Sequence, residues 1–156
     1  MHLWEKAREV RMEVSGAITG GFDIGFDQEI PEQMRDLLME FVYWVEDNYP
    51  IPVTLWVDFK YRHYLLSREK KRVDYLFYWV DFENYPVFTE PDDIPVIYLP
   101  VRTERQDEKE ILRAFATGIT DYFAWLTGGD MKNFSADACE VEAILEAYYR
   151  SRGACQ

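Results

Sequence analysis

The segment ILRAFATGITDYFAWL, residues 111–126, is the most informative stretch of the 156-residue chain. Its apolar residues recur at spacings of three and four, which predicts a helix with one broad apolar stripe. The other side of this helix carries small or polar residues, namely Ala114, Thr117, Gly118, Asp121 and Ala124. A solvated helix face normally carries Lys and Glu instead. The small residues therefore indicate either close approach by another element or a cleft.

Two further helices are expected around this segment. Pro31 predicts the first residue of a helix that ends near Asn48, before Tyr49-Pro50. A capping box of Thr103 and Gln106 predicts that the central helix begins near Asp107 and runs to Thr127, and Ser135 is expected to cap a last helix that ends near Arg152.

Alternating apolar and polar residues predict the strands. Residues 8–29 are typical of a hairpin with a turn at Gly20-Gly21, and residues 52–65 and 72–82 each predict a strand. The proline-bounded segment 94–100, IPVIYLP, predicts a short strand at a sheet edge. Antiparallel strands followed by helices indicate an α+β fold, with an antiparallel or mixed sheet of about three to five strands in a single domain.

The composition narrows the function classes. Seventeen basic and 29 acidic residues give a net charge of −12, which disfavours nucleic acid and anionic membrane surfaces as partners. No segment has the apolar length of a membrane span, and the first residues do not resemble a signal peptide. Two cysteines, Cys139 and Cys155, are too few for a disulfide framework, so a cytoplasmic location is expected.

The central segment resembles the active-site helix of small SprT-like and zincin-type metallopeptidases. In that family an edge strand of the IPVIYL kind precedes a helix that reads roughly L-x-H-E-x-x-H-Y-x-x-W-L. The flanking residues match at Tyr122, Trp125, Leu126 and Gly128. The resemblance implies a zincin-like domain over residues 1–156, with an N-terminal helix, an active-site-type helix and a C-terminal helix around the sheet.

The residues that carry the family's chemistry are absent. Thr117 and Asp121 stand at the two histidine positions of the HExxH motif, and Gly118 stands at the position of the general-base glutamate. The resemblance implies a third ligand position at Glu142, with Glu140 as the next candidate. Catalytic zinc requires three protein ligands, usually rich in nitrogen, and the chain's two histidines are not paired at ligand spacing. We therefore expect no metal, no cofactor and no catalytic residue.

The expected site is a vestigial cleft floored by Thr117, Gly118, Asp121 and Glu142, with Tyr98 and Trp125 at its rim. Asp121 with Glu142 would at most favour a hard cation such as Mg²⁺ or Ca²⁺, and weakly. The plainer interpretation of Asp121 is an ion pair with Arg113 or Arg150.

Two functions follow from these expectations. The first is a non-hydrolytic pseudo-metallopeptidase that binds a protein or peptide, for which strand addition at 94–100 is the expected mode. The alternative is an acidic interaction protein, of the immunity-protein or DNA-mimic type, that binds a basic partner. Its surface would come from two acidic runs, Glu104-Asp107-Glu108-Glu110 and Asp81-Glu83-Glu90-Asp92-Asp93.

Overall fold

The computed structural model describes residues 2–8, 20–78, 95–101, 108–127 and 138–153. Within them the fold is α+β, with four helices and a mixed four-stranded sheet. The helices are α1 (Leu3–Arg8), α2 (Glu32–Asn48), α3 (Glu108–Leu126) and α4 (Ala138–Gly153). The strands are β1 (Phe22–Phe26), β2 (Leu55–Lys60), β3 (Leu65–Leu66), β4 (Arg72–Val73), β5 (Leu76–Tyr78) and β6 (Val96–Pro100).

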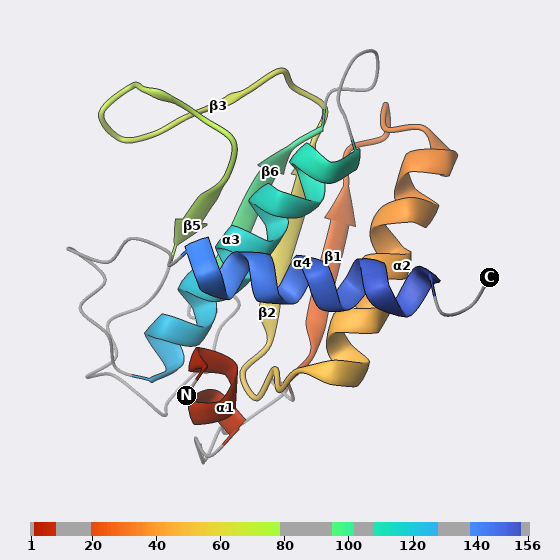
Figure 1. Cartoon of the computed structure of the whole chain (residues 1–156). Coiled ribbons are helices and arrows are strands. Elements are labelled where there is room, and N and C mark those ends of the chain that lie inside the picture. Colours follow the sequence, from red (N-terminus) through yellow and green to blue (C-terminus); the bar gives the residue numbers. More distant parts are fainter. Residues whose placement is uncertain (1, 9–19, 79–94, 102–107, 128–137, 154–156) are drawn as a thin grey trace.

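The sheet has the order β1-β2-β6-β5. Strands β1, β2 and β6 are parallel, and β5 pairs with β6 in the antiparallel direction. Between β2 and β5 the chain forms a separate small hairpin of β3 and β4, visible above the sheet in Figure 1. The expected mixed sheet of three to five strands is therefore confirmed, and the purely antiparallel alternative is wrong because parallel pairing joins three of the four strands.

The expected edge strand at 94–100 is also misplaced. Strand β6 has β2 on one side and β5 on the other, so it lies inside the sheet. The prolines at its ends do not prevent this position, since Pro95 precedes the strand and Pro100 is its last residue. In the described part of the sheet, β5 has a hydrogen-bonded neighbour on one side only and forms one edge, with β1 at the other.

The remaining predicted helices and strands agree with the structure to different extents. The helix expected after Pro31 and the central helix lie within two residues of their expected bounds. The strand expected at 72–82 is interrupted between β4 and β5. The first arm of the expected 8–29 hairpin and the caps at Thr103, Gln106 and Ser135 lie outside the described residues. The second arm of the expected hairpin is β1, which pairs with β2. The expected turn glycines have positive φ angles, 90° for Gly20 and 78° for Gly21.

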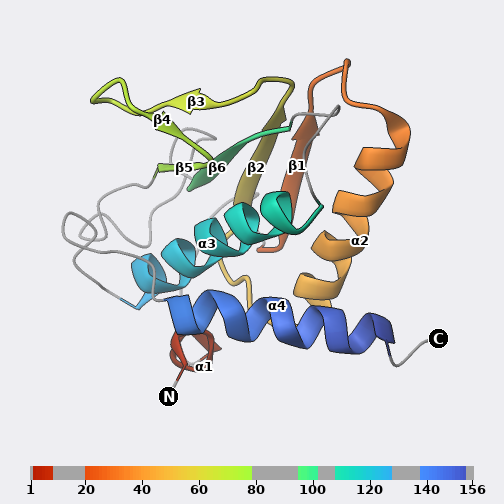
Figure 2. The ribbon, with the colours of Figure 1, turned by 45° about the horizontal axis from the view of Figure 1, so that its top comes forward.

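The helices gather on one face of the sheet. Figure 2 shows α2 and α3 below the sheet, with α4 crossing beneath them. Helix α3 contacts β5, β6, α4 and α1, and the Tyr148 ring of α4 packs edge-on against Phe41 of α2 at 4.9 Å. The core accordingly lies between the sheet and the helices. None of the described helices is both long and apolar enough to cross a membrane.

The two faces of the sheet differ in burial. On β2, the side chains of Leu55, Val57 and Phe59 are fully buried on the helix side, whereas the alternate residues Trp56, Asp58 and Lys60 are only partly buried. Strand β6 repeats this alternation with Ile97 and Leu99 buried and Val96 and Tyr98 partly buried. One face is therefore closed by helices, and we call the other the open face.

Helix α3 lies unusually close to the sheet at Gly118. A Cβ atom at this position would lie 2.9 Å from Cδ1 and 3.1 Å from Cγ2 of Ile97. Tyr122, one turn further along, donates its hydroxyl proton to the carbonyl oxygen of Val53 and accepts a hydrogen bond from the Val53 N–H at 3.1 Å. The small residue at 118 thus serves helix–sheet packing.

We predict that Gly118→Val destabilises the fold by about 1–3 kcal/mol, because the new methyl groups overpack the contact with Ile97. Gly153→Val is the matched control, since a Cβ at this position, also in a helix, would have no atom within 4 Å. Its free energy of unfolding should stay within about 0.5 kcal/mol of the parent value. Urea unfolding of both variants provides the measurement, and equal effects would show that the contact is not tight.

Candidate functional site

The expected cleft on α3 is filled by packing. Gly118 is buried against Ile97, as described above, and therefore does not line a groove. The Thr117 hydroxyl donates a hydrogen bond to the carbonyl oxygen of Arg113 at 2.7 Å, within the helix itself. Trp125 is 1% exposed, so its expected place at a binding rim is wrong. The small face of α3 corresponds to close approach by the sheet.

The two carboxylates expected at the cleft have separate partners. Glu142 forms an ion pair with Arg113 on the surface between α4 and α3. The expected pair of Asp121 with Arg113 or Arg150 is wrong, because Asp121 forms a hydrogen bond with the Tyr75 side chain and no ion pair with either arginine within the described residues. Glu140, the other candidate, accepts a hydrogen bond from the Leu3 N–H at 3.3 Å and lies 3.0 Å from Nδ1 of His2. These contacts attach α1 to α4 and leave Glu140 with a structural role.

Asp121 is the one buried carboxylate on α3, with 8% of its surface exposed. Burial raises the pKa of Asp121 from 3.8 to about 6, and a hydrogen bond with the Tyr75 side chain partly opposes this rise. The pKa of Tyr75 is raised in turn, first by its own burial and then by the charge on Asp121. The pair therefore joins α3 to the segment that precedes β5.

Three metal-binding side chains do not come together in the part of the chain that the structure describes. No group of three His, Cys, Asp or Glu residues lies close enough there to hold an ion. Asp121 and Glu142 are each engaged by another residue of the chain.

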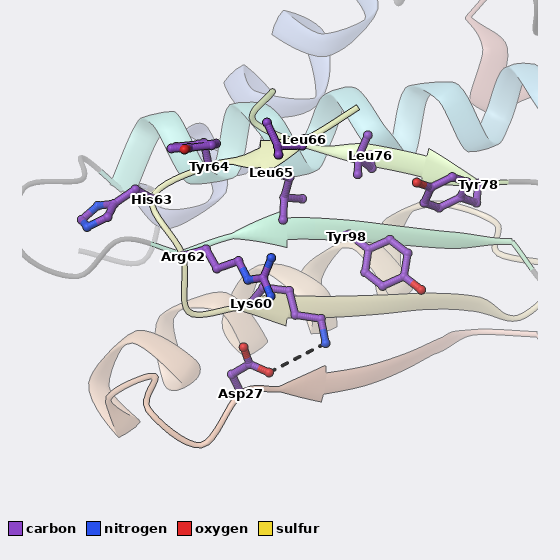
Figure 3. Close-up of a pocket in the computed structure, with 10 residues that line it drawn as sticks. All are labelled: Asp27, Lys60, Arg62, His63, Tyr64, Leu65, Leu66, Leu76, Tyr78 and Tyr98. Atoms are coloured by element: carbon purple, nitrogen blue, oxygen red, sulfur yellow. Dashed lines mark ion pairs between the residues drawn. The ribbon is translucent and has the colours of Figure 1, made fainter. Parts of the chain in front are cut away.

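A pocket of about 840 Å³ lies on the open face of the sheet, where sequence reasoning did not place a site. Its lining comes from the ends of β1 and β2, the segment up to β3, and the outward side chains of β5 and β6. Figure 3 shows the lining residues, which are Asp27, Lys60, Arg62, His63, Tyr64, Leu65, Leu66, Leu76, Tyr78 and Tyr98.

The floor of the pocket is formed by side chains that alternate with buried residues along β5 and β6. Leu76 and Tyr78 flank the buried Phe77 on β5, and Tyr98 lies between the buried Ile97 and Leu99 on β6. The rings of Tyr78 and Tyr98 meet edge-to-face with centroids 5.6 Å apart. Tyr98 was expected near the α3 cleft, but it lies on the opposite face of the sheet from Gly118 and lines this pocket instead.

Asp27 organises the end of the pocket near β1. Its Oδ2 accepts a hydrogen bond from the Tyr61 N–H at 2.9 Å, which fixes the chain as it leaves β2. Its Oδ1 lies 3.8 Å from Nζ of Lys60, and Asp58 Oδ2 lies at the same distance from that ammonium. Figure 3 marks the Asp27–Lys60 ion pair. Lys60 is therefore shared between two carboxylates.

The rim of the pocket exposes apolar surface. Four large hydrophobic residues in the described part of the chain are exposed, and two of them, Tyr64 and Leu66, line the pocket. The other two are Tyr43 on α2 and Tyr61, which follows β2. Exposed apolar groups gathered beside a pocket are typical of a binding surface. The sequence signal for this cluster is the run YRHYLL at 61–66, of which residues 61–65 fell within the strand predicted at 52–65. That prediction is wrong after Lys60, where β2 ends, and β3 begins at Leu65.

Comparisons with known proteins give no relatives: no protein-family model, curated protein or solved structure matches the chain.

The titration of Asp121 yields a stability prediction. Because its pKa is higher in the folded protein than in the unfolded chain, the folded state binds the proton more tightly between pH 3.8 and about 6. The free energy of unfolding therefore falls as the pH rises through this window. Asp121→Asn removes the ionising group and with it this loss. The unfolding free energy of the variant relative to the parent should therefore rise by on the order of 2–3 kcal/mol from pH 4 to pH 7.

Thermal or urea unfolding at both pH values measures this gain. Asp36→Asn, which changes an exposed carboxylate on α2, is the control and should give the same difference from the parent at each pH. A difference for Asp121→Asn that does not change with pH would contradict the burial of an ionising carboxylate at this position.

Proposed function

We propose that this chain is a non-hydrolytic domain that binds an extended peptide segment of another protein in the pocket on the open face of the sheet. The observation that carries the proposal is the location of the pocket, where two of the four exposed large hydrophobic residues of the described chain, Tyr64 and Leu66, adjoin a floor of Tyr78, Tyr98 and Leu76. Tyrosine side chains that bury a large ring and retain a polar tip are favoured at protein interfaces.

Strand β5 supports a peptide as the ligand. It is one of the two edges of the described sheet, and its side chains at 76 and 78 face the pocket. A peptide that adds to a sheet edge gains main-chain hydrogen bonds and places every second side chain on the same face. Because β5 is only three residues long, the pocket would have to supply much of the affinity.

The proposal that the domain does not hydrolyse peptides rests on the residues of α3. Thr117, Gly118 and Asp121 offer no nitrogen donor at the positions that the metallopeptidase resemblance assigns to the zinc ligands and the general base. Descent from a zincin-type peptidase remains part of this proposal. It is supported by the order of β6 before α3 and by the retained Tyr122, Trp125 and Leu126, all three of which are buried.

The alternative proposal, an acidic protein that binds a basic partner, draws on residues that lie mostly outside the described chain. Glu108, one of the described members of its two acidic runs, is paired with Arg152 at 2.6 Å. The experiment below separates the two proposals, because a basic partner would not require the tyrosine floor.

Selection of peptides from a random displayed library with the purified domain tests the proposed function. We predict that Tyr98→Ala weakens binding of the selected peptides at least about tenfold, because loss of a buried aromatic contact costs about 1–2 kcal/mol or more. Tyr43→Ala removes an exposed ring on α2 and should leave the affinity within about twofold. Mass spectrometry should find the peptides uncut, with or without added zinc.

Cleavage of the peptides, or equal affinity of the Tyr98→Ala and Tyr43→Ala variants, would contradict the proposal. Salt-dependent capture of a basic protein that is unaffected by Tyr98→Ala would favour the acidic-protein alternative instead.

A further inference from the structure

Positive charge is concentrated around the pocket of this acidic protein. Residues 60–72 carry six of the chain's 17 Lys and Arg residues and only one of its 29 acidic residues, Glu69. The same stretch includes His63, one of the two histidines. Lys60, Arg62 and His63 line the pocket directly, and the β3–β4 hairpin carries the remaining cations next to it. Residues 60–72 therefore carry a charge opposite in sign to that of the whole chain, while Asp27, which also lines the pocket, offsets the charge of Lys60.

Two of these guanidinium groups lie over tyrosine rings beside the pocket. The Cζ atom of Arg72 is 4.3 Å from the ring centroid of Tyr64, and that of Arg68 is 5.9 Å from the ring centroid of Tyr78. A guanidinium stacked on a ring keeps its N–H groups available at its edge. These groups donate in a fork geometry that matches a carboxylate.

Arg62 is the arginine among the residues that line the pocket. Its side chain is exposed, and it forms no ion pair with an acidic residue within the described part of the chain. Figure 3 shows Arg62 beside Lys60, which is already shared between Asp27 and Asp58. An incoming carboxylate would find its strongest unpaired donor at Arg62.

The overall charge of −12 does not prevent such a contact. The Debye length is about 8 Å at physiological ionic strength, so the cations at the pocket dominate the field felt by a ligand inside it. A long polyanion such as nucleic acid would extend beyond this basic region and meet the acidic remainder of the surface. Charge complementarity therefore favours a short anionic segment.

We propose that the ligand of the pocket is an acidic peptide segment, in which Asp or Glu residues alternate with aromatic or aliphatic ones. The acidic side chains pair with Arg62 and the guanidinium groups of the β3–β4 hairpin, and the apolar side chains pack on Tyr78, Tyr98 and Leu76. This inference rests on the proposed function, since it specifies the chemistry of the peptide that the same pocket binds.

Fluorescence anisotropy with three labelled peptides tests the charge preference. The probes share one sequence in which Leu and Phe alternate with Glu, with Gln or with Lys. The Glu peptide should bind at least about tenfold more tightly than the Gln peptide, and the Lys peptide more weakly still. The preference should decrease as salt is raised. Labelled single-stranded DNA of similar length should bind more weakly than the Glu peptide.

Two variants locate the interaction. Arg62→Glu should weaken the Glu peptide at least about tenfold and reduce the difference between the Glu and Lys peptides. Arg150→Glu, an exposed site on α4 with the same change in net charge, should leave both affinities within about twofold. Circular dichroism melting verifies that both variants fold.

The outcomes test the acidic-peptide inference separately from the proposed function. Equal or tighter binding of the Lys peptide, tighter binding of the DNA, or equal effects of the two Arg variants would overturn the acidic-peptide inference. If Tyr98→Ala still abolished binding of the Gln peptide in that case, the proposed function would stand. If none of the three peptides bound, both proposals would fail.

Discussion

The contact between Gly118 of α3 and Ile97 of β6 determines how closely the helical layer approaches the sheet. Thirteen of the 19 residues of α3 are buried, because the helix has the sheet on one side and α4 and α1 on another. A side chain larger than hydrogen at 118 would force either the Ile97 side chain or α3 to shift. The hydrogen bonds of Tyr122 with Val53 add a polar attachment between α3 and the segment before β2. The placement of both sheet faces follows from this one packing arrangement.

Closure of one sheet face makes the other available for binding. Helices α2 and α3 cover the side of Val57 and Ile97, whereas the alternate side chains of β2, β5 and β6 face the pocket. The short hairpin of β3 and β4 brings cations and exposed apolar groups to the same place. The pocket thus combines the two features that peptide recognition requires, an apolar floor and oriented charged donors.

The sequence predicted α2, α3 and α4 because their apolar stripes are long and regular, but it did not predict the six-residue α1. The expected bounds of the helix after Pro31 and of the central helix lie within two residues of α2 and α3. Strand existence was also predictable, but pairing was not, because the alternation on β6 is the same for an edge and for an interior strand. The short β5 lies within the strand predicted at 72–82, but its place at one edge of the described sheet has no sequence signal.

The expected site was less predictable than the fold. Small residues on a helix indicate either a cleft or close packing, and only the position of Ile97 distinguishes these alternatives. The pocket depends on residues 27, 60–66, 76–78 and 98, which pairing brings together from four parts of the chain. The basic run at 60–72 can be recognised in the sequence, but the sequence does not show that Tyr78 and Tyr98 lie next to it. Asp121 illustrates the same limit, since its partner Tyr75 comes from a distant segment.

The most direct measurement of binding at the open face is amide chemical-shift mapping by NMR with a bound peptide. The largest changes should fall on residues 60–66, on β5 and on Tyr98, with little change along the buried face of α3. Changes that instead centre on Thr117, Asp121 and Glu142 would place binding on the helical side and contradict the assignment of the site.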